Sequence, residues 1–275
     1  MIAFYDTHAH LDYPDYSQDL PQVVGRAVAC GIIKIVTIGT TLASSQQAVG
    51  LAERFANIFA VVGWHPNEAL EAPEDLRPAL RELAKHPKVV ALGETGLDYY
   101  RLPSREKGGT VEQDESLKRK QAQVFLQHLE VAAEAGLNCV IHQRGAFEDT
   151  LAVMRPFAER VRGQFHCFAE DAVAMRRVLE MGSVVSFTGI LTFKSAQNIR
   201  DTLAATPLGQ FMLETDCPYL APVPYRGKRC EPAYVKEIAQ VAAQVQGRTL
   251  EELSAATCEA AQKFFPKIRH QEPTV

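Results

Sequence analysis

The sequence has no long hydrophobic run, and no apolar stretch approaches the roughly 20 residues that a membrane-spanning helix needs. We therefore expect no association with membranes. Positive charge is not in excess either, because 29 lysines and arginines face 33 aspartates and glutamates and leave a formal net charge of -4. This balance argues against a broad basic surface for long nucleic acids and leaves room only for a local basic patch.

The sequence also lacks paired cysteines, and we expect no leader peptide. Its six cysteines are scattered without any C-x-x-C pair, and residues 1–5 run straight into Asp6 without a signal sequence. Disulfide-stabilised secreted proteins and small zinc-ribbon proteins show the opposite pattern. We expect a protein of the reducing cytoplasm without disulfides, and no sequence feature indicates an obligate protein partner.

No linker, internal repeat or low-complexity tract divides the chain, so we predict a single domain over residues 1–275. Eight short apolar runs alternate with amphipathic stretches, and the runs are continuously apolar, as in strands that are buried on both faces. They cover residues 2–5, 35–39, 58–63, 89–93, 139–141, 164–165, 184–187 and 211–213.

This alternation predicts a parallel α/β sheet, and eight units in 275 residues predict a single (β/α)8 TIM-type barrel. Thr249-Leu250-Glu251-Glu252 has the form of a capping box and predicts an extra C-terminal helix. A doubly wound open sheet is the competing architecture, but no glycine-rich phosphate loop follows the first strand. The irregular stretch Arg101 to Asp114 is predicted to be a long surface loop.

Polar residues follow the apolar runs. His8 and His10 lie two positions apart, so on a strand both side chains point to one face. Four further candidates come at the ends of later runs: Glu94, His142, His166 and Asp216. In a barrel these strand ends meet at one mouth, where active sites are built.

Each of these residues has an ordinary structural explanation when taken alone. A buried histidine often hydrogen-bonds only to the backbone, and a strand-end aspartate often caps the next helix. As a group, however, ionisable side chains in one mouth must be paired or bound to cations. Six ligands are too many for one tetrahedral ion with an open position, and they suit two ions that share a bridging carboxylate.

The motifs together resemble those of the TatD-type metal-dependent deoxyribonucleases of the amidohydrolase superfamily. The similarity runs from Ile2 to about Phe265. The stretches that carry it are Asp6-Thr7-His8-Ala9-His10-Leu11-Asp12, Gly63-Trp64-His65-Pro66, Gly93-Glu94-Thr95-Gly96-Leu97-Asp98-Tyr99, Ile141-His142-Gln143-Arg144, His166-Cys167-Phe168 and Glu214-Thr215-Asp216-Cys217-Pro218-Tyr219-Leu220.

The resemblance implies a two-metal hydrolase on a (β/α)8 barrel and assigns its ligands. One ion would be held by His8, His10, Glu94 and Asp216, and the other by Glu94, His142 and His166, with Glu94 bridging. His65 matches a position at the rim of the site, where we expect it to contact substrate.

Two stretches depart from the family pattern. The family usually has His-Ser-Arg-Asp where this chain has His142-Gln143-Arg144-Gly145, and Arg-Asn-Glu-Pro where this chain has Arg229-Cys230-Glu231-Pro232. Neither change removes a ligand. Both concern loops that line the mouth, and therefore the choice of substrate.

Basic residues also gather at the expected mouth. Arg144 comes two residues after the candidate ligand His142, and Arg226, Lys228 and Arg229 follow the eighth strand. Late loops of barrel enzymes often bind phosphate, which arginine can contact through two hydrogen bonds. We interpret these four residues as candidate phosphate contacts, while a solvated charged loop is an equal alternative for the last three.

The leading hypothesis is a hydrolase that cuts phosphodiester bonds, with DNA as the expected partner at the barrel mouth. Asp216 is the candidate proton acceptor and Glu94 the bridging catalytic carboxylate. The alternative is an ester or amide hydrolase, such as one that cleaves aminoacyl esters on tRNA. Many relatives with those substrates bridge their metals with a carbamylated lysine, whereas this chain has Glu94.

A third hypothesis, a barrel that only binds its ligand, predicts missing ligands, and all six are present. Four histidines favour Zn, Mn, Ni or Fe over Mg, although phosphoryl chemistry often uses Mg. We therefore expect two divalent ions, drawn from Zn, Mg, Mn or Ni.

Overall fold

A computed structural model describes residues 2–105 and 108–268 and shows eight parallel strands in one sheet, in the order of the sequence. The strands are β1 (Phe4–Ala9), β2 (Ile32–Ile38), β3 (Ile58–Val62), β4 (Val89–Asp98), β5 (Asn138–Arg144), β6 (Gly163–Phe165), β7 (Val184–Phe187) and β8 (Phe211–Leu213). Each of the eight predicted apolar runs contains or overlaps one of them.

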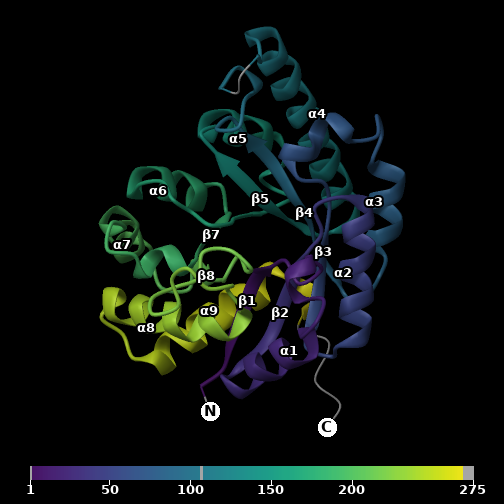
Figure 1. Ribbon diagram of the computed structural model, residues 1–275. Helices are drawn as coiled ribbons and strands as arrows, with labels where there is room; N and C mark the ends of the chain where they lie inside the picture. The colour runs from purple at the N-terminus through teal and green to yellow at the C-terminus, as the bar shows by residue number, and fades with distance from the viewer. Residues whose placement is uncertain (1, 106–107, 269–275) are drawn as a thin grey trace.

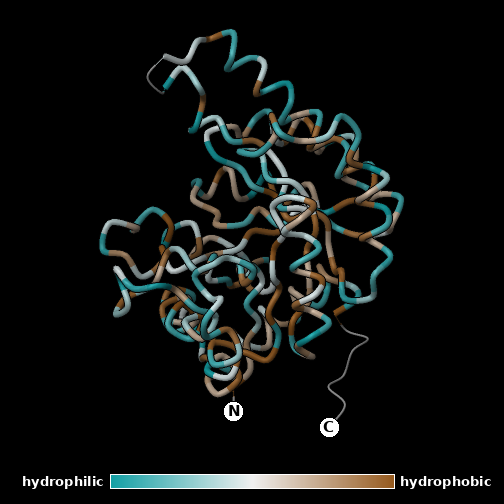
Figure 2. The backbone as a smooth tube through the Cα atoms, turned by 45° about the vertical axis from the view of Figure 1, so that its right-hand side comes forward, coloured by the Kyte–Doolittle hydropathy of each residue, from teal (hydrophilic) through white to brown (hydrophobic). Residues whose placement is uncertain are grey.

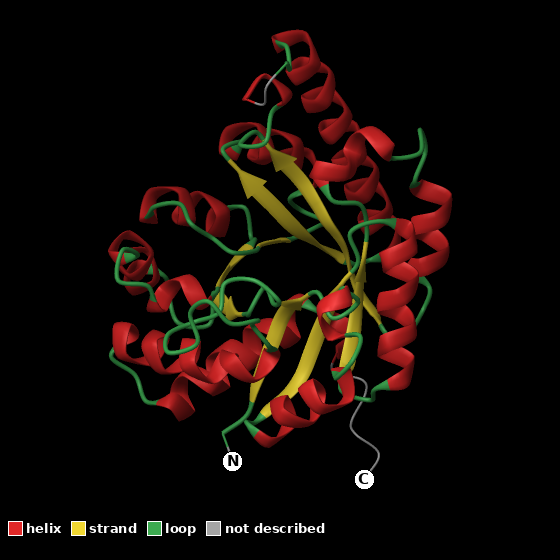
Figure 3. Ribbon diagram, viewed as in Figure 1, coloured by secondary structure: helices red, strands yellow, loops and turns green. Residues whose placement is uncertain are grey.

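Helices surround the strands (Figures 1 and 3). They are α1 (Leu20–Ala29), α2 (Leu42–Arg54), α3 (Arg77–Ala84), α4 (Val111–Ala135), α5 (Phe147–Met154), α6 (Ala172–Glu180), α7 (Gln197–Ala205), α8 (Val235–Gln246) and α9 (Leu250–Phe264). Short 3-10 helices cover Pro14–Tyr16, Pro66–Glu71, Pro103–Arg105, Arg155–Phe157, Gly189–Thr192, Pro232–Tyr234 and Pro266–Ile268. The architecture is a (β/α)8 TIM barrel with α9 as an additional C-terminal helix, as predicted.

Side chains at the join between β1 and β8 close the barrel. The two carboxylate oxygens of Asp6 accept hydrogen bonds from the backbone N–H of Thr215 at 2.9 Å and from its hydroxyl at 2.6 Å. The backbone N–H of Asp216 donates to the carbonyl oxygen of His8 at 2.9 Å. The first and last strands, more than 200 residues apart, are therefore held edge to edge at the end where the candidate ligands lie.

The opposite end of the barrel is covered by α9. Phe264, Phe265 and Ile268 are fully buried against inward-pointing strand residues such as Tyr5 and Phe59. The predicted capping box is confirmed, because the Thr249 side chain and the N3 residue of α9 bond reciprocally to the backbone. Figure 2 shows the hydrophobic segments gathered along the strands in the interior. Burial at this end stabilises the barrel and leaves the other end for chemistry.

Two sequence-based boundaries need correction. The predicted loop Arg101 to Asp114 includes residues 106–107, which lie outside the described residues. It is too long, because α4 begins at Val111 after Thr110 forms a capping box with Gln113. β4 was expected to end at Gly93 but runs to Asp98, since it continues to pair with β5 up to the register Asp98–Arg144. Local hydrophobicity does not show pairing with a neighbouring strand, so the apolar run ended at Gly93 although the strand continues.

None of the helices within the described ranges has the length and apolar character needed to cross a membrane.

A buried histidine fastens α4 to the chain next to the mouth. The His128 Nε2 accepts a hydrogen bond from the Trp64 backbone N–H at 3.0 Å, and its Nδ1 lies 2.7 Å from the carbonyl oxygen of Val124. Because the backbone N–H can only donate, Nδ1 carries the hydrogen and the ring is neutral. Burial lowers the pKa of His128 to about 4.

This depressed pKa predicts a loss of stability in mild acid. The unfolded chain takes up a proton on His128 below its usual pKa of 6.5, whereas the folded chain does so only near 4. The free energy of unfolding of the parent should therefore fall by about 2 kcal/mol more than that of His128→Gln between roughly pH 7 and pH 4.5. Denaturant unfolding of both proteins at the two pH values measures the difference. Parallel pH profiles would contradict the assignment.

Candidate metal centre

The polar residues at the carboxyl ends of the strands meet in one cavity of about 350 Å³. Five of the six predicted ligands line it, and the sixth, His8, lies directly beneath Glu94 and His10. The rim is formed by Arg144, the last residue of β5, and by Tyr13, Asn67, Arg101 and Tyr219, which come from segments after the strands. The structure thus brings together all six residues that the sequence singled out. They come from β1, β4 and β5 and from the segments that follow β1, β6 and β8.

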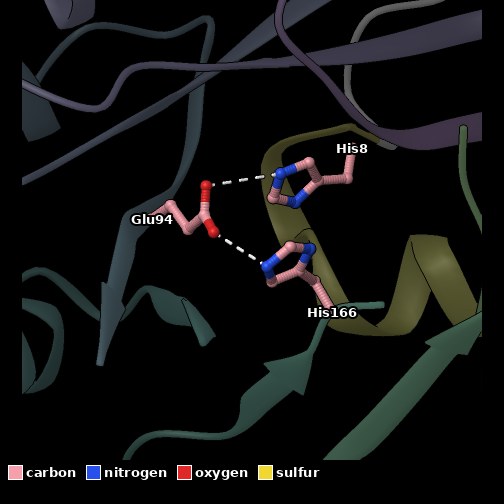
Figure 4. A group of neighbouring side chains, drawn as sticks. All are labelled: His8, Glu94 and His166. Atoms are coloured by element: carbon pink, nitrogen blue, oxygen red, sulfur yellow. Dashed lines mark ion pairs between the residues drawn. The ribbon is translucent and has the colours of Figure 1, made fainter. Parts of the chain in front are cut away.

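Glu94 lies at the centre of the group, and its two carboxylate oxygens face different histidines. Oε1 is 2.8 Å from His166 Nε2 and 2.9 Å from His142 Nδ1. Oε2 is 3.5 Å from His8 Nε2 and 3.7 Å from His10 Nε2. Figure 4 shows His8 and His166 pointing at the two oxygens. This division between two sets of imidazoles is what a bridging carboxylate requires.

Asp216 completes the side of the cluster near β1. Its Oδ1 lies 3.4 Å from His10 Nε2 and 3.6 Å from His8 Nε2, and the two Nε2 atoms are 3.3 Å apart. Three overlapping groups have ligand atoms close enough to hold a metal ion. They are His8, His10 and Asp216; His8, Glu94 and His166; and His65, Glu94 and His142.

Glycines let the strands that carry the ligands approach closely. Gly93 and Gly96 on β4 have φ values of 117° and 138°, which L side chains rarely adopt. A Cβ at Gly93 would overlap the carbonyl oxygen of Val140, and one at Gly96 would overlap that of His142. These contacts place Glu94 beside the β5 histidine.

In this cluster the buried carboxylates and imidazoles stabilise one another's charged forms. Burial alone would raise the pKa of Glu94, but the imidazoles around it, with His166 and His65 foremost, hold it well below the usual value. Conversely, burial opposes protonation of His166, yet Glu94 and Glu214 raise its pKa well above normal. A buried site with this attraction for positive charge suits dications. Imidazole and carboxylate donors together fit Zn, Mn, Ni or Fe ions.

His65 also lies in the cluster, but its hydrogen bonds leave a ring hydrogen, and not a lone pair, directed into the cavity. Its Nδ1 accepts a hydrogen bond from the Asn67 backbone N–H at 3.1 Å. The hydrogen of the neutral ring therefore lies on Nε2, which points at Glu94 Oε1 at 3.4 Å and at His142 Nδ1 at 3.2 Å. In this tautomer His65 can donate a hydrogen bond into the cavity, so substrate contact stays our prediction for it.

Of the four candidate phosphate contacts, the structure places only Arg144 in the lining of the cavity. Arg144 lines the cavity, and its guanidinium stacks on the Tyr100 ring at 3.7 Å. Arg101 lines the same cavity and was not singled out from the sequence, where the only signal was its place in the irregular stretch after β4. Within the described ranges neither arginine has a carboxylate partner.

The late-loop residues do not line this cavity. Arg229 pairs with Asp19 at 2.8 Å and stacks on Tyr16, whereas Arg226 lies over the Phe193 ring at 3.7 Å. Lys228 is 5.9 Å from the Tyr225 ring centroid. A phosphate contact by these three residues would have to lie outside the central cavity and stays a prediction.

Comparisons with known proteins agree with the barrel and the cluster. A family profile described as "TatD related DNase" matches residues 5–266. An uncharacterized metal-dependent hydrolase of Bacillus subtilis, YabD, is 37% identical over 262 residues, which cover 95% of this chain and 98% of that protein. A protein of Enterobacter lignolyticus named "3'-5' ssDNA/RNA exonuclease TatD" is 32% identical over 267 residues, covering 95% and 98% respectively.

Among solved structures, the TatD homologue YjjV of Escherichia coli superposes with a TM-score of 0.86 at 24% identity, covering 97% of this chain and 99% of that one. Fold, cluster and relatives define a metal-dependent hydrolase. The chain belongs to the TatD family, as the motifs predicted.

If Glu94 bridges two dications, its loss should empty more of the centre than the loss of a histidine that serves one. We expect close to two ions per chain in the parent, about one in His166→Gln, and less than one in Glu94→Gln. Elemental analysis after mild dialysis measures the stoichiometry, with circular dichroism as the control for folding. Equal metal content in the two variants would show that Glu94 does not bridge.

Proposed function

We propose that this chain is a two-metal nuclease that hydrolyses phosphodiester bonds, with DNA as its foremost substrate. The observation that carries the proposal is that Arg101 and Arg144 line the same cavity as the histidine–carboxylate cluster. Neither guanidinium group has a carboxylate partner in the described chain. Positive side chains at the rim of a cavity that already attracts dications suit an anionic substrate. The family description and the printed name of the Enterobacter relative support the same chemistry.

Two dications would be held by His8, His10, Glu94, His142, His166 and Asp216. When bound, they supply Lewis acidity, which activates water and neutralises charge on phosphoryl oxygens. Asp216 accepts the proton of the attacking water at a carboxylate oxygen. Burial would raise its pKa, but the hydrogen bond with His10 and the nearby imidazoles lower it, so it is ionised and ready to accept.

The residues at the rim orient the substrate. Arg101 and Arg144 contact the phosphate that is to be cut or its neighbour. His65 donates from Nε2 to a phosphoryl oxygen, since the Asn67 N–H occupies its other nitrogen. These contacts hold the scissile bond near Asp216 and Glu94.

A substrate panel tests the proposal directly. Purified protein would be assayed on single- and double-stranded DNA, RNA, a phosphomonoester and an aminoacyl ester, each with Zn, Mg, Mn or Ni. We expect metal-dependent cleavage of the nucleic acids. Cleavage of the aminoacyl ester alone would overturn the proposal in favour of the alternative hydrolase, and hydrolysis by metal-free protein would overturn both.

The rim arginines should act through binding. Neutralising either Arg101 or Arg144 to glutamine should raise KM for DNA about tenfold or more, because a charge-assisted hydrogen bond is lost. The slope of log binding against log salt should fall by about one per lost contact. Arg81→Gln, whose guanidinium pairs with Glu134 on the outside of the barrel, is the matched control.

Arg226, Lys228 and Arg229 can be tested in the same assay as a triple glutamine variant. A reduced salt slope would support their predicted phosphate contact. An unchanged slope in this triple variant, with a reduced slope in the rim variants, would restrict phosphate binding to the cavity.

Asp216→Asn should separate catalysis from binding. Asparagine tolerates the left-handed conformation found here, where φ is 57°, and it keeps the shape while it removes the charge. We expect kcat at saturating metal to fall roughly a hundredfold to ten-thousandfold, with a much smaller change in KM. Activity within about tenfold of the parent would show that another group takes the proton.

A further inference from the structure

A buried carboxylate lies behind the cluster, on the side of His142 that faces away from the other ligands. Asp98 is the last residue of β4, and its side chain is 1% exposed. Its Oδ2 lies 3.2 Å from His142 Nε2, while the other ring nitrogen, Nδ1, is directed at Glu94. Asp98 was part of the motif that carried the family resemblance, but the ligand set gives it no role.

The position of Asp98 is fixed by backbone groups. Its Oδ1 accepts hydrogen bonds from the N–H of Tyr100 at 2.8 Å and of Arg101 at 3.2 Å. Its own backbone N–H donates to Gln121 Oε1, and its carbonyl oxygen accepts from Gln121 Nε2. Because one carboxylate oxygen is held by the loop, the other is presented to His142 in a fixed direction.

The contact decides which nitrogen of His142 can bind a cation. An ionised carboxylate only accepts hydrogen bonds, so Nε2 carries a ring hydrogen directed at Asp98. When a cation lies beside Glu94, the ring is neutral and Nδ1 has the lone pair that can bind the cation. Nδ1 lies 2.9 Å from Glu94 Oε1. A lone pair and a carboxylate oxygen at this distance repel unless a positive ion or a proton lies with them. The geometry is therefore that of a histidine prepared as a metal ligand.

We propose that Asp98 is a positioning residue of the metal centre, which holds His142 in the Nδ1-ligand tautomer and in the orientation that reaches the ion beside Glu94. The inference rests on the metal centre of the proposed function and adds a residue outside the ligand set. It does not require that the substrate be DNA.

Asp98→Asn is the direct test. The asparagine oxygen can still accept from the Tyr100 and Arg101 N–H groups, but its amide nitrogen then faces His142 Nε2. Both groups cannot donate, so the imidazole hydrogen moves to Nδ1 or the contact is lost. In either case His142 becomes a poorer ligand.

The readout is binding of Co²⁺ alone, without substrate. Titration of metal-free protein should show two ions in the parent, and in Asp98→Asn one of them should bind about tenfold to a hundredfold more weakly. The visible Co²⁺ absorption of that ion should change as well. Asp114→Asn is the matched control, since Asp114 also holds this loop by accepting from the Ser104 N–H and hydroxyl but touches no histidine in the described chain.

Two further variants separate positioning from folding. Asp98→Ser can still accept hydrogen bonds from the loop backbone but cannot reach His142. It should weaken binding of the same ion, and it serves as the test if Asp98→Asn disturbs folding. In the His142→Gln background, Asp98→Asn should cause no additional loss of Co²⁺ affinity, because its partner is gone.

The outcomes distinguish this inference from the proposed function. Parent-like Co²⁺ affinity and spectrum in both Asp98 variants would overturn the role of Asp98 while leaving the metal centre intact. An additive loss in the double variant would show that Asp98 acts otherwise than through His142. A parent protein that binds no Co²⁺ would overturn the metal centre itself.

Discussion

The structure at the mouth depends on one buried charge, the carboxylate of Glu94. An ionised carboxylate away from water is strongly unfavourable unless it is paired and hydrogen-bonded. Here imidazoles from β1 and β5 and from the segments after β3 and β6 surround it, so the charge is compensated by residues that are far apart in the sequence. The arrangement directs several imidazole and carboxylate ligand atoms at a small volume, and these atoms could hold a metal ion. The need to compensate Glu94 and the capacity to hold metal are therefore the same property.

Compensation of Glu94 requires a closed barrel. His8 and His10 are supplied by the first strand and Asp216 by the segment after the last, so an open sheet would leave the cluster incomplete. The bonds between Asp6 and Thr215 fasten these two edges directly below the ligands. At the other end α9 buries Phe264 and Phe265 against the barrel interior. These contacts below the ligands and at the opposite end hold the barrel together, so the mouth can carry closely spaced ionisable groups.

Local sequence patterns were sufficient for the strands and for the capping box at Thr249. They also indicated where the predicted ligands lie, within or soon after β1, β4, β5, β6 and β8. They were insufficient wherever a partner distant in the sequence decides the outcome. β4 extends to Asp98 because β5 pairs with it, and Arg229 is engaged by Asp19, which precedes it by 210 residues. No sequence pattern identifies Arg101 as a site residue, and only the position of the segment after β4 shows that it lines the cavity. Periodicity and motifs predict the local structure of a segment. Strand pairing and ion pairs between distant segments can be assigned only once the positions of those segments in space are known.

The two neighbouring histidines at the rim show why positions in space matter for chemistry. His65 and His142 are the same residue type, and their facing nitrogens lie 3.2 Å apart. A backbone N–H at Asn67 leaves the first ring with a hydrogen directed into the cavity, and a carboxylate at Asp98 leaves the second with a lone pair. One can donate to an incoming anion and the other can bind a cation. The difference arises from a single contact behind each ring. The group behind a histidine therefore decides whether the ring offers a hydrogen or a lone pair to the cavity.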